Sequence, residues 1–210
     1  MTPGFSLKEA AAVAGVPEPV IRKAIEAGTI RPCAVTSGLM PRYRFGVKDM
    51  LYLKLLSDFP LPLDREDKAA LRRLVEGRCR STGRWHAADG DLVIRSGDLT
   101  LHVEVGRVRD ALARRLSTWR RGRRRIVRDP AVLGGEPVFA GTRIPLAHVA
   151  ALFAKGVPAD EIAEDYPALS REDLGFAAMC AKMKRDPGRP RKPLRLLRGG
   201  EAVEGRSDRP

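Results

Sequence analysis

Residues 126–145 read IVRDPAVLGGEPVFAGTRIP, and this stretch determines how the rest of the chain is interpreted. Pro130 and Pro137 each fix one backbone torsion, and three glycines permit left-handed or crowded geometry. The pattern predicts a short, turned, partly extended segment that leads into a helix starting near Pro145. Such a segment is too small to have a core of its own. We therefore expect it to brace the helices on either side, or to present an edge to a partner.

The spacing of this stretch resembles that of a known protein family. The family pattern is D-P-x-x-x-x-G-x-P-x-x-x-G-T-R-I-P, followed by Gly156, the pair Glu161-Ile162 and the triplet Asp165-Tyr166-Pro167. The resemblance covers residues 126–183. The family comprises small bacterial and archaeal proteins, first catalogued as a domain of unknown function. They are now mostly viewed as VapB-type antitoxins, so the resemblance implies a PIN-like ribonuclease toxin as partner.

The composition favours a polyanionic partner. The 210 residues carry a formal charge of +13, the isoelectric point is about 10.4, and 43% of the residues are hydrophobic. This length allows one or two small domains, with enough apolar residues for a core. So much positive charge indicates contact with nucleic acid. The alternative is an excess of arginine that only keeps the chain soluble.

The sequence contains no recognisable catalytic or metal-binding set. The cysteines and histidines are scattered, which argues against a disulfide framework, a metal knuckle and a Cys/His nucleophile: Cys33, Cys79, Cys180, His86, His102 and His148. There is no phosphate-binding P-loop and no nucleophile–base set. We expect no cofactor, no metal and no enzymatic activity. No signal peptide is visible and no apolar run approaches 18 residues, so we expect a cytoplasmic protein without membrane contact.

Residues 1–60 have the order of elements of a winged helix-turn-helix. Ser6 and Glu9 form a capping box that opens one helix, and Pro17 opens a second. A two-stranded wing and an apolar helix follow. This order is similar to the N-terminal domain of MerR-type regulators, and the resemblance implies DNA contacts from the second helix and the wing. The candidate contacts are Arg22, Lys23, Arg42 and Arg44. The alternative is a small packing module of three helices.

Residues 61–125 are expected to hold a capped helix, a β-hairpin and a basic helix or linker. Asp64 is the predicted N-cap. Residues 91–95 and 99–105 flank the glycine turn Ser96-Gly97-Asp98, which is typical of a hairpin with a three-residue loop. A hairpin is marginal alone, so it should pack on something or pair across a twofold axis. We interpret this part as a structural or dimerisation element.

Residues 106–128 are the most basic part of the chain, with ten arginines and one acidic residue, Asp110. A helical stripe gives way to a dense run of like charges, which predicts a partly mobile segment unless an anion is near. We predict phosphate contacts from this run. The residues are Arg120, Arg121, Arg123, Arg124 and Arg125. A solvated linker is the alternative.

Residues 126–185 should form a second unit of three helices with a homeodomain-like arrangement. Pro145 and Pro158 open the first two helices, and Ser170 caps the third. The predicted inner face of the third helix consists of Leu174, Ala177, Ala178 and Ala181. Residues 129–185 contain six basic and eight acidic residues, which is unfavourable for phosphate. We therefore favour protein contact over DNA contact here.

Residues 186–210 are expected to be a flexible basic tail that could fold on a partner. Arginine pairs well with clustered carboxylates of the kind that the family resemblance implies in the toxin. The predicted toxin contacts are Arg143, Arg189, Arg191, Lys192, Leu194, Arg195, Leu196, Leu197 and Arg198. An ordinary frayed terminus is the alternative.

These observations predict a mainly α protein with small β hairpins. The expected function is that of an antitoxin, which binds operator DNA as a homodimer to repress its own transcription and neutralises a PIN-like ribonuclease. The alternative is a MerR-like transcriptional regulator without a toxin partner.

Overall fold

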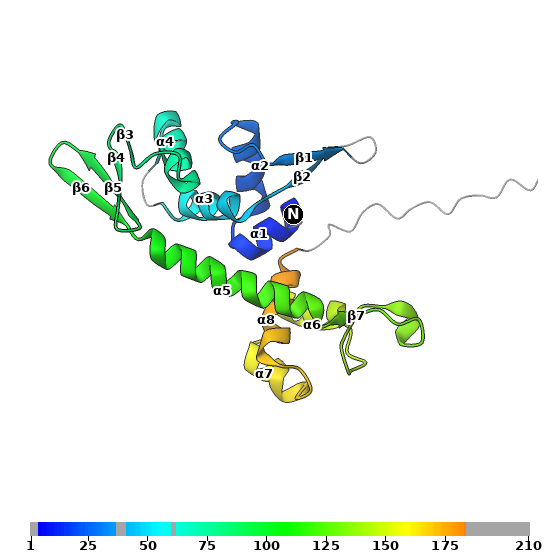
Figure 1. Cartoon of the computed structure of the whole chain (residues 1–210). Coiled ribbons are helices and arrows are strands. Elements are labelled where there is room, and N and C mark those ends of the chain that lie inside the picture. The colour runs from blue at the N-terminus through cyan, green and yellow to red at the C-terminus, as the bar shows by residue number, and fades with distance from the viewer. Residues whose placement is uncertain (1–3, 37–40, 60–61, 184–210) are drawn as a thin grey trace, which may run out of the picture.

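The structure is a computed structural model that describes residues 4–36, 41–59 and 62–183. Helices dominate, with small antiparallel sheets between them, as the sequence predicts (Figure 1). In chain order the elements are α1 (Leu7–Ala14), α2 (Glu18–Glu26), β1 (Cys33–Thr36), β2 (Pro41–Arg44), α3 (Val47–Asp58), α4 (Arg65–Glu76), β3 (Ser81–Thr82), β4 (Trp85–Ala88), β5 (Asp91–Ser96), β6 (Leu99–Val103), α5 (Val105–Arg124), β7 (Ile126–Val127), the 3-10 turn η1 (Leu133–Gly135), β8 (Val138–Phe139), α6 (Leu146–Ala154), α7 (Ala159–Asp165) and α8 (Arg171–Ala181).

The long helix α5 is the axis of the molecule (Figure 1). Helices α1, α2 and α3 lie along one side of it, together with the hairpin β1–β2. The sheet β3–β6 leads into the start of α5, and helices α6, α7 and α8 gather near its end. Among the residues described, no helix combines the length and apolarity needed to cross a membrane.

Side-chain caps set the predicted helix starts. The Ser6 hydroxyl accepts a hydrogen bond from the Glu9 N–H, and the Glu9 carboxylate accepts one from the Ser6 N–H at 2.8 Å. Asp64 accepts from the Asp67 N–H at 2.7 Å, and Ser170 forms a second capping box. Each cap pairs a backbone N–H that the helix leaves unpaired, which stabilises the helix by about 1 kcal/mol. These predictions are confirmed.

The sheet is larger than the predicted hairpin. Its four strands are antiparallel in the order β3-β4-β5-β6, and β3 and β4 were not predicted. The predicted three-residue loop is wrong: Ser96 pairs with Leu99, which leaves a two-residue loop whose Gly97 has φ +58°. The predicted strand over residues 99–105 is also too long, since β6 ends at Val103 and α5 begins at Val105.

Two clusters of buried side chains hold the chain together, and α8 contributes to both. The larger cluster joins α1–α5 and the sheet, and it includes Phe176 and Met179 of α8. The smaller cluster lies within residues 126–183 and includes Leu174 and Ala177 of the same helix. The predicted inner face of α8 is therefore incomplete. Ala178 and Ala181 are half-buried, whereas Phe176 and Met179 are buried toward the larger cluster.

The segment at residues 126–145 closes back on the end of α5. Ile126 pairs with Phe139 in the short ribbon β7–β8, and Val138 and Phe139 are fully buried. The carbonyl oxygen of Arg125 accepts a hydrogen bond from the Ala140 N–H at 2.7 Å. Between the two strands, Leu133 has φ +46° and is 54% exposed. The segment thus contributes to the smaller cluster while joining it to α5.

Candidate nucleic-acid interface

Helix α2 exposes the first pair of predicted DNA contacts. Its buried side consists of Ile21 and Ala24, which are 0% and 5% exposed. Arg22 and Lys23 lie on the opposite, exposed side. The guanidinium of Arg22 lies 3.7 Å from the Glu18 carboxylate, an exposed ion pair that is easily exchanged for another anion.

The hairpin β1–β2 carries the second pair. Arg42 is exposed, and Arg44 is half-buried with its guanidinium 3.5 Å from the Gly4 carbonyl oxygen. The base of the hairpin is fixed because Phe5 and Phe45 exchange backbone hydrogen bonds of 3.0 and 2.8 Å. Hairpin and α2 belong to one unit, since Phe45 and Ile21 lie in the same buried cluster.

The arginine run after Trp119 is helical, and the condition under which order was expected, a nearby anion, is met. Residues 120–124 are the last turns of α5, and Arg125 is its C-cap. Three of the five arginines bind acidic residues of the same chain. Arg121 binds Glu172, Arg123 lies 3.3 Å from Glu9, and Arg125 lies 2.9 Å from Asp173. Carboxylates of the same chain therefore supply the anions that such a dense run of arginines needs for order.

Arg120 and Arg124 differ from these three arginines. Both are exposed, and neither makes an ion pair or side-chain hydrogen bond with any residue that the structure describes. The structure therefore divides the predicted phosphate contacts into two groups. Arg120 and Arg124 remain available to an external anion, whereas Arg121, Arg123 and Arg125 already have internal partners.

The contact between Arg125 and Asp173 is the most buried of these ion pairs. Asp173 is 0% exposed and also accepts hydrogen bonds from the hydroxyl and backbone N–H of Ser170. Burial alone would raise the pKa of the Asp173 carboxyl. The hydrogen bonds from Arg125 and Ser170 outweigh it and hold the pKa below its ordinary value. Arg125 and Asp173 thus fasten the end of α5 to the start of α8.

Close packing between α5 and α8 reinforces this attachment. A Cβ atom placed on Gly122 would lie 2.2 Å from the Cβ of Phe176, and one placed on Gly175 would lie 3.0 Å from Thr118. The rings of Trp119 and Phe176 are 5.0 Å apart. Because Gly122 and Gly175 have no side chains, the two helices approach closely, and the basic end of α5 is held rigidly.

Of the predicted toxin contacts, only Arg143 lies within the described residues. Arg143 is exposed in the turn before α6. The remaining predicted contacts lie outside the described residues: Arg189, Arg191, Lys192, Leu194, Arg195, Leu196, Leu197 and Arg198.

One arginine has a structural role that is not evident from the sequence. Arg115 of α5 donates hydrogen bonds of 2.6 Å to the carbonyl oxygens of Ala12 and Val13 at the end of α1. Burial lowers the pKa of its guanidinium. In sequence it is one of ten arginines between residues 106 and 128. Its position beside Leu116 on the apolar side of the helix is the only local signal.

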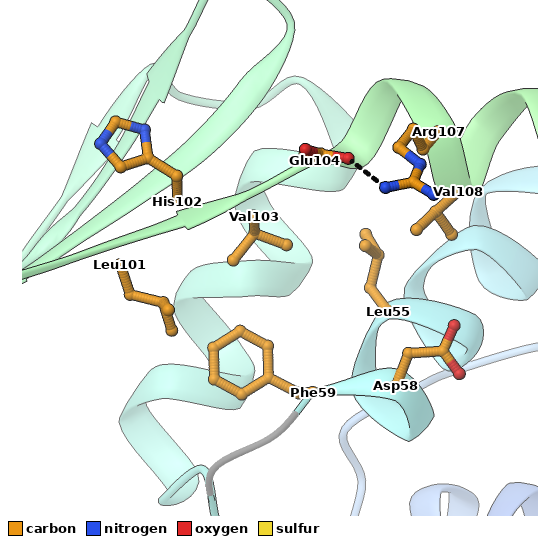
Figure 2. A pocket seen from close by; sticks show the side chains of 9 residues that line it. All are labelled: Leu55, Asp58, Phe59, Leu101, His102, Val103, Glu104, Arg107 and Val108. Atoms are coloured by element: carbon orange, nitrogen blue, oxygen red, sulfur yellow. Dashed lines mark hydrogen bonds and ion pairs between the residues drawn. The ribbon is translucent and has the colours of Figure 1, made fainter.

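An apolar hollow of about 310 Å³ lies away from these basic residues. It is bounded by the end of α3, by β6 and by the start of α5. Figure 2 shows Leu55, Phe59, Leu101, Val103 and Val108 pointing toward one another, with charged groups at the rim. Within residues 4–36, 41–59 and 62–183, no three His, Cys, Asp or Glu side chains are placed to hold a metal ion.

Known proteins resemble parts of this chain. A family described as "Protein of unknown function (DUF433)" matches residues 126–179. An uncharacterized protein, y4eO from Sinorhizobium fredii, is 28% identical over 134 residues, which are 61% of this chain and 59% of that protein. The crystal structure of Rv2018 from Mycobacterium tuberculosis aligns over 85% of this chain and 98% of its own, with 16% identity and a TM-score of 0.32. The chain thus spans about 59% of the length of the curated relative.

Proposed function

We propose that this chain is a DNA-binding antitoxin. Its N-terminal unit binds operator DNA, and its C-terminal unit with the following tail binds and neutralises a PIN-like ribonuclease. The observation that carries the DNA-binding half is the placement of α2 and the hairpin β1–β2, each of which exposes basic side chains, on one buried core.

Helix α2 has the dimensions and chemistry for the major groove. An α-helix with its side chains is about 10–12 Å wide, and the groove is about 12 Å wide. Arg22 and Lys23 are neighbours on the exposed side, where their donors can reach base edges or phosphates. Arg42 on the hairpin would contact the backbone as a wing does. This is the winged helix-turn-helix interpretation of residues 1–60.

Arg120 and Arg124 suit a supporting role in DNA binding. They are exposed at the end of α5 and have no partner among the residues described, so binding a phosphate would break no internal contact. Arg121, Arg123 and Arg125 would have to release a carboxylate first. We therefore assign these three arginines to structure and the other two to phosphate.

The C-terminal unit is better suited to a protein partner than to DNA. Helix α7 exposes four carboxylates within seven residues, which repel phosphate. These residues are Asp160, Glu161, Glu164 and Asp165. The ribonuclease as partner is inferred from the resemblance at residues 126–183. Arg143 and the basic tail would supply the pairing for its carboxylates.

The DNA-binding half is tested by gel retardation with the promoter region upstream of the gene. Arg22→Ala combined with Lys23→Ala should abolish the retarded complex. The matched control is Arg65→Ala with Arg73→Ala, which removes the same charge from the exposed side of α4. Arg120→Ala with Arg124→Ala should lower the slope of log K against log salt by about 2. Retention of binding by the α2 variant, with loss in the α5 variant, would show that the N-terminal assignment is wrong.

Co-expression tests the antitoxin half. A PIN-like protein encoded beside this gene should arrest growth alone and be harmless when this chain is present. Deletion of residues 187–210 should weaken that protection and leave DNA binding largely unchanged. If the neighbour is not toxic, or is not silenced, a regulator without a toxin partner becomes the better interpretation.

A further inference from the structure

The sheet β3–β6 ends in an unpaired strand. Strand β6 pairs with β5 on one side only and lies at the outer edge of the sheet (Figure 1). The N–H of Arg95 donates to the carbonyl oxygen of Arg84, so the backbone groups of Arg95 face β4. Thr100 lies opposite Arg95 in the register of β5 and β6. The N–H and C=O of Thr100 must therefore point away from β5, and the same holds for His102, two residues further along β6. No backbone partner reaches these groups from the described part of the chain.

This edge lacks the features that normally prevent pairing with another chain. Exposed edge strands usually carry lysine or other charges, proline or a bulge. The five residues of β6, Leu-Thr-Leu-His-Val, contain none of the charged types and no proline. Their register with β5 runs without interruption from residue 99 to residue 103. A regular, uncharged edge is a template for another strand.

The sequence of β6 is suited to pairing with itself. Polarity alternates symmetrically about Leu101. In an antiparallel pair of two copies centred there, residue 99 falls opposite 103, Thr100 opposite His102, and Leu101 opposite Leu101. At the centre of the pair, Leu101 of one copy then faces Leu101 of the other. Thr100 and His102, whose backbone groups face outward, form the hydrogen-bonded pairs, with four bonds across the twofold axis.

The hollow of about 310 Å³ adjoins this edge. Leu101 and Val103 of β6 point toward Phe59 and Leu55, whereas His102 points away from the hollow (Figure 2). A partner strand in register would bring its own Leu101 alongside, on the same face of the sheet. Apolar surface of Phe59, which is half-buried, would then be covered by a second apolar side chain.

We propose that β6 is the dimerisation edge of this protein, and that two copies form a continuous antiparallel sheet of eight strands. The outward face of α5 cannot serve instead. It carries Arg109, Arg114, Arg120 and Arg124, with Asp110 as its acidic residue, so two copies would repel each other. The dimer requires neither DNA nor a ribonuclease, and its test is independent of the proposed function.

Sedimentation equilibrium of the full chain tests the proposal. The wild type should sediment as a dimer of twice 23.1 kDa. Thr100→Pro removes an N–H that points outward and leaves every hydrogen bond to β5 in place. An edge strand tolerates a proline at such a position. It should raise the dimer Kd at least tenfold, or about 1.4 kcal/mol. The control Thr100→Val keeps the N–H and should dimerise like the wild type. A monomeric wild type, or equal dimerisation by all three proteins, would overturn the proposal.

A cysteine at the axis gives a second readout that does not depend on how the proline variant folds. Opposed residues of a non-hydrogen-bonded pair have Cα atoms about 4.5 Å apart, within disulfide range. Leu101→Cys should therefore yield a covalent dimer on mild oxidation, above the background from the native cysteines. Ala88→Cys, exposed on β4, should not. Equal cross-linking of both variants, or of neither, would contradict pairing at β6.

Discussion

Replacement of Gly122 by alanine tests whether close contact between α5 and α8 stabilises the fold. A Cβ at residue 122 would lie 2.2 Å from the Cβ and 2.4 Å from the Cγ of Phe176, far inside van der Waals contact. Overpacking of this kind costs about 1–3 kcal/mol, and the better helix propensity of alanine returns at most about 1 kcal/mol. We expect a net loss of about 1–2 kcal/mol. This corresponds to a decrease in Tm of roughly 2–8 °C for a chain of this size.

The same substitution at Gly106 is the matched control, since this glycine lies in the first turn of the same helix. Its added Cβ would lie 3.7 Å from the Asp91 carboxylate, an ordinary contact. Gly106→Ala should leave Tm unchanged or raise it slightly. Both variants are compared by circular dichroism during heating. An unchanged Tm for Gly122→Ala, or equal shifts for the two variants, would refute the packing argument.

Two further predictions concern buried polar contacts. Arg115→Ala leaves the carbonyl oxygens of Ala12 and Val13 without their donor, so urea denaturation should show a loss of about 1–3 kcal/mol. The control Arg114→Ala, at an exposed position, should stay within about 0.5 kcal/mol of wild type. The lowered pKa of Asp173 means that its stabilising effect is complete above its unfolded-state pKa and is lost as pH falls through the lower folded value. Urea midpoints measured from about pH 6 downward should thus fall less steeply in Asp173→Asn than in the wild type.

Local signals in the sequence were enough to predict the helix starts. A capping box needs two side chains three residues apart, so Ser6 with Glu9 and Ser170 with Asp173 are visible in a short window. Glycine and proline likewise mark the turns of residues 126–145 because they restrict or free the backbone of their own residue. These features involve interactions between near neighbours, which a single sequence displays directly.

The order of the arginine run could not be predicted from neighbouring residues in the same way. Its order depends on Glu9, Glu172 and Asp173, which lie 114, 51 and 48 residues from their partners. Only the fold brings those carboxylates to α5. In sequence the run is a repulsive cluster, and in the structure more than half of its charges are neutralised. Strand β3 was missed for a related reason, since its two residues are too few to show a periodic pattern.

The position of α8 between two cores limits where the chain can be divided. The matched family segment ends at residue 179 and begins at 126, which would make it an obvious piece to excise or to graft onto another protein. Yet Phe176 and Met179 belong to the larger cluster, whose other buried members all precede residue 126. An excised segment would expose both side chains to water and would lose Arg125, the partner of its buried carboxylate. In this protein the segment matched by the family begins in sequence at residue 126, but its packing continues into α5, which precedes it.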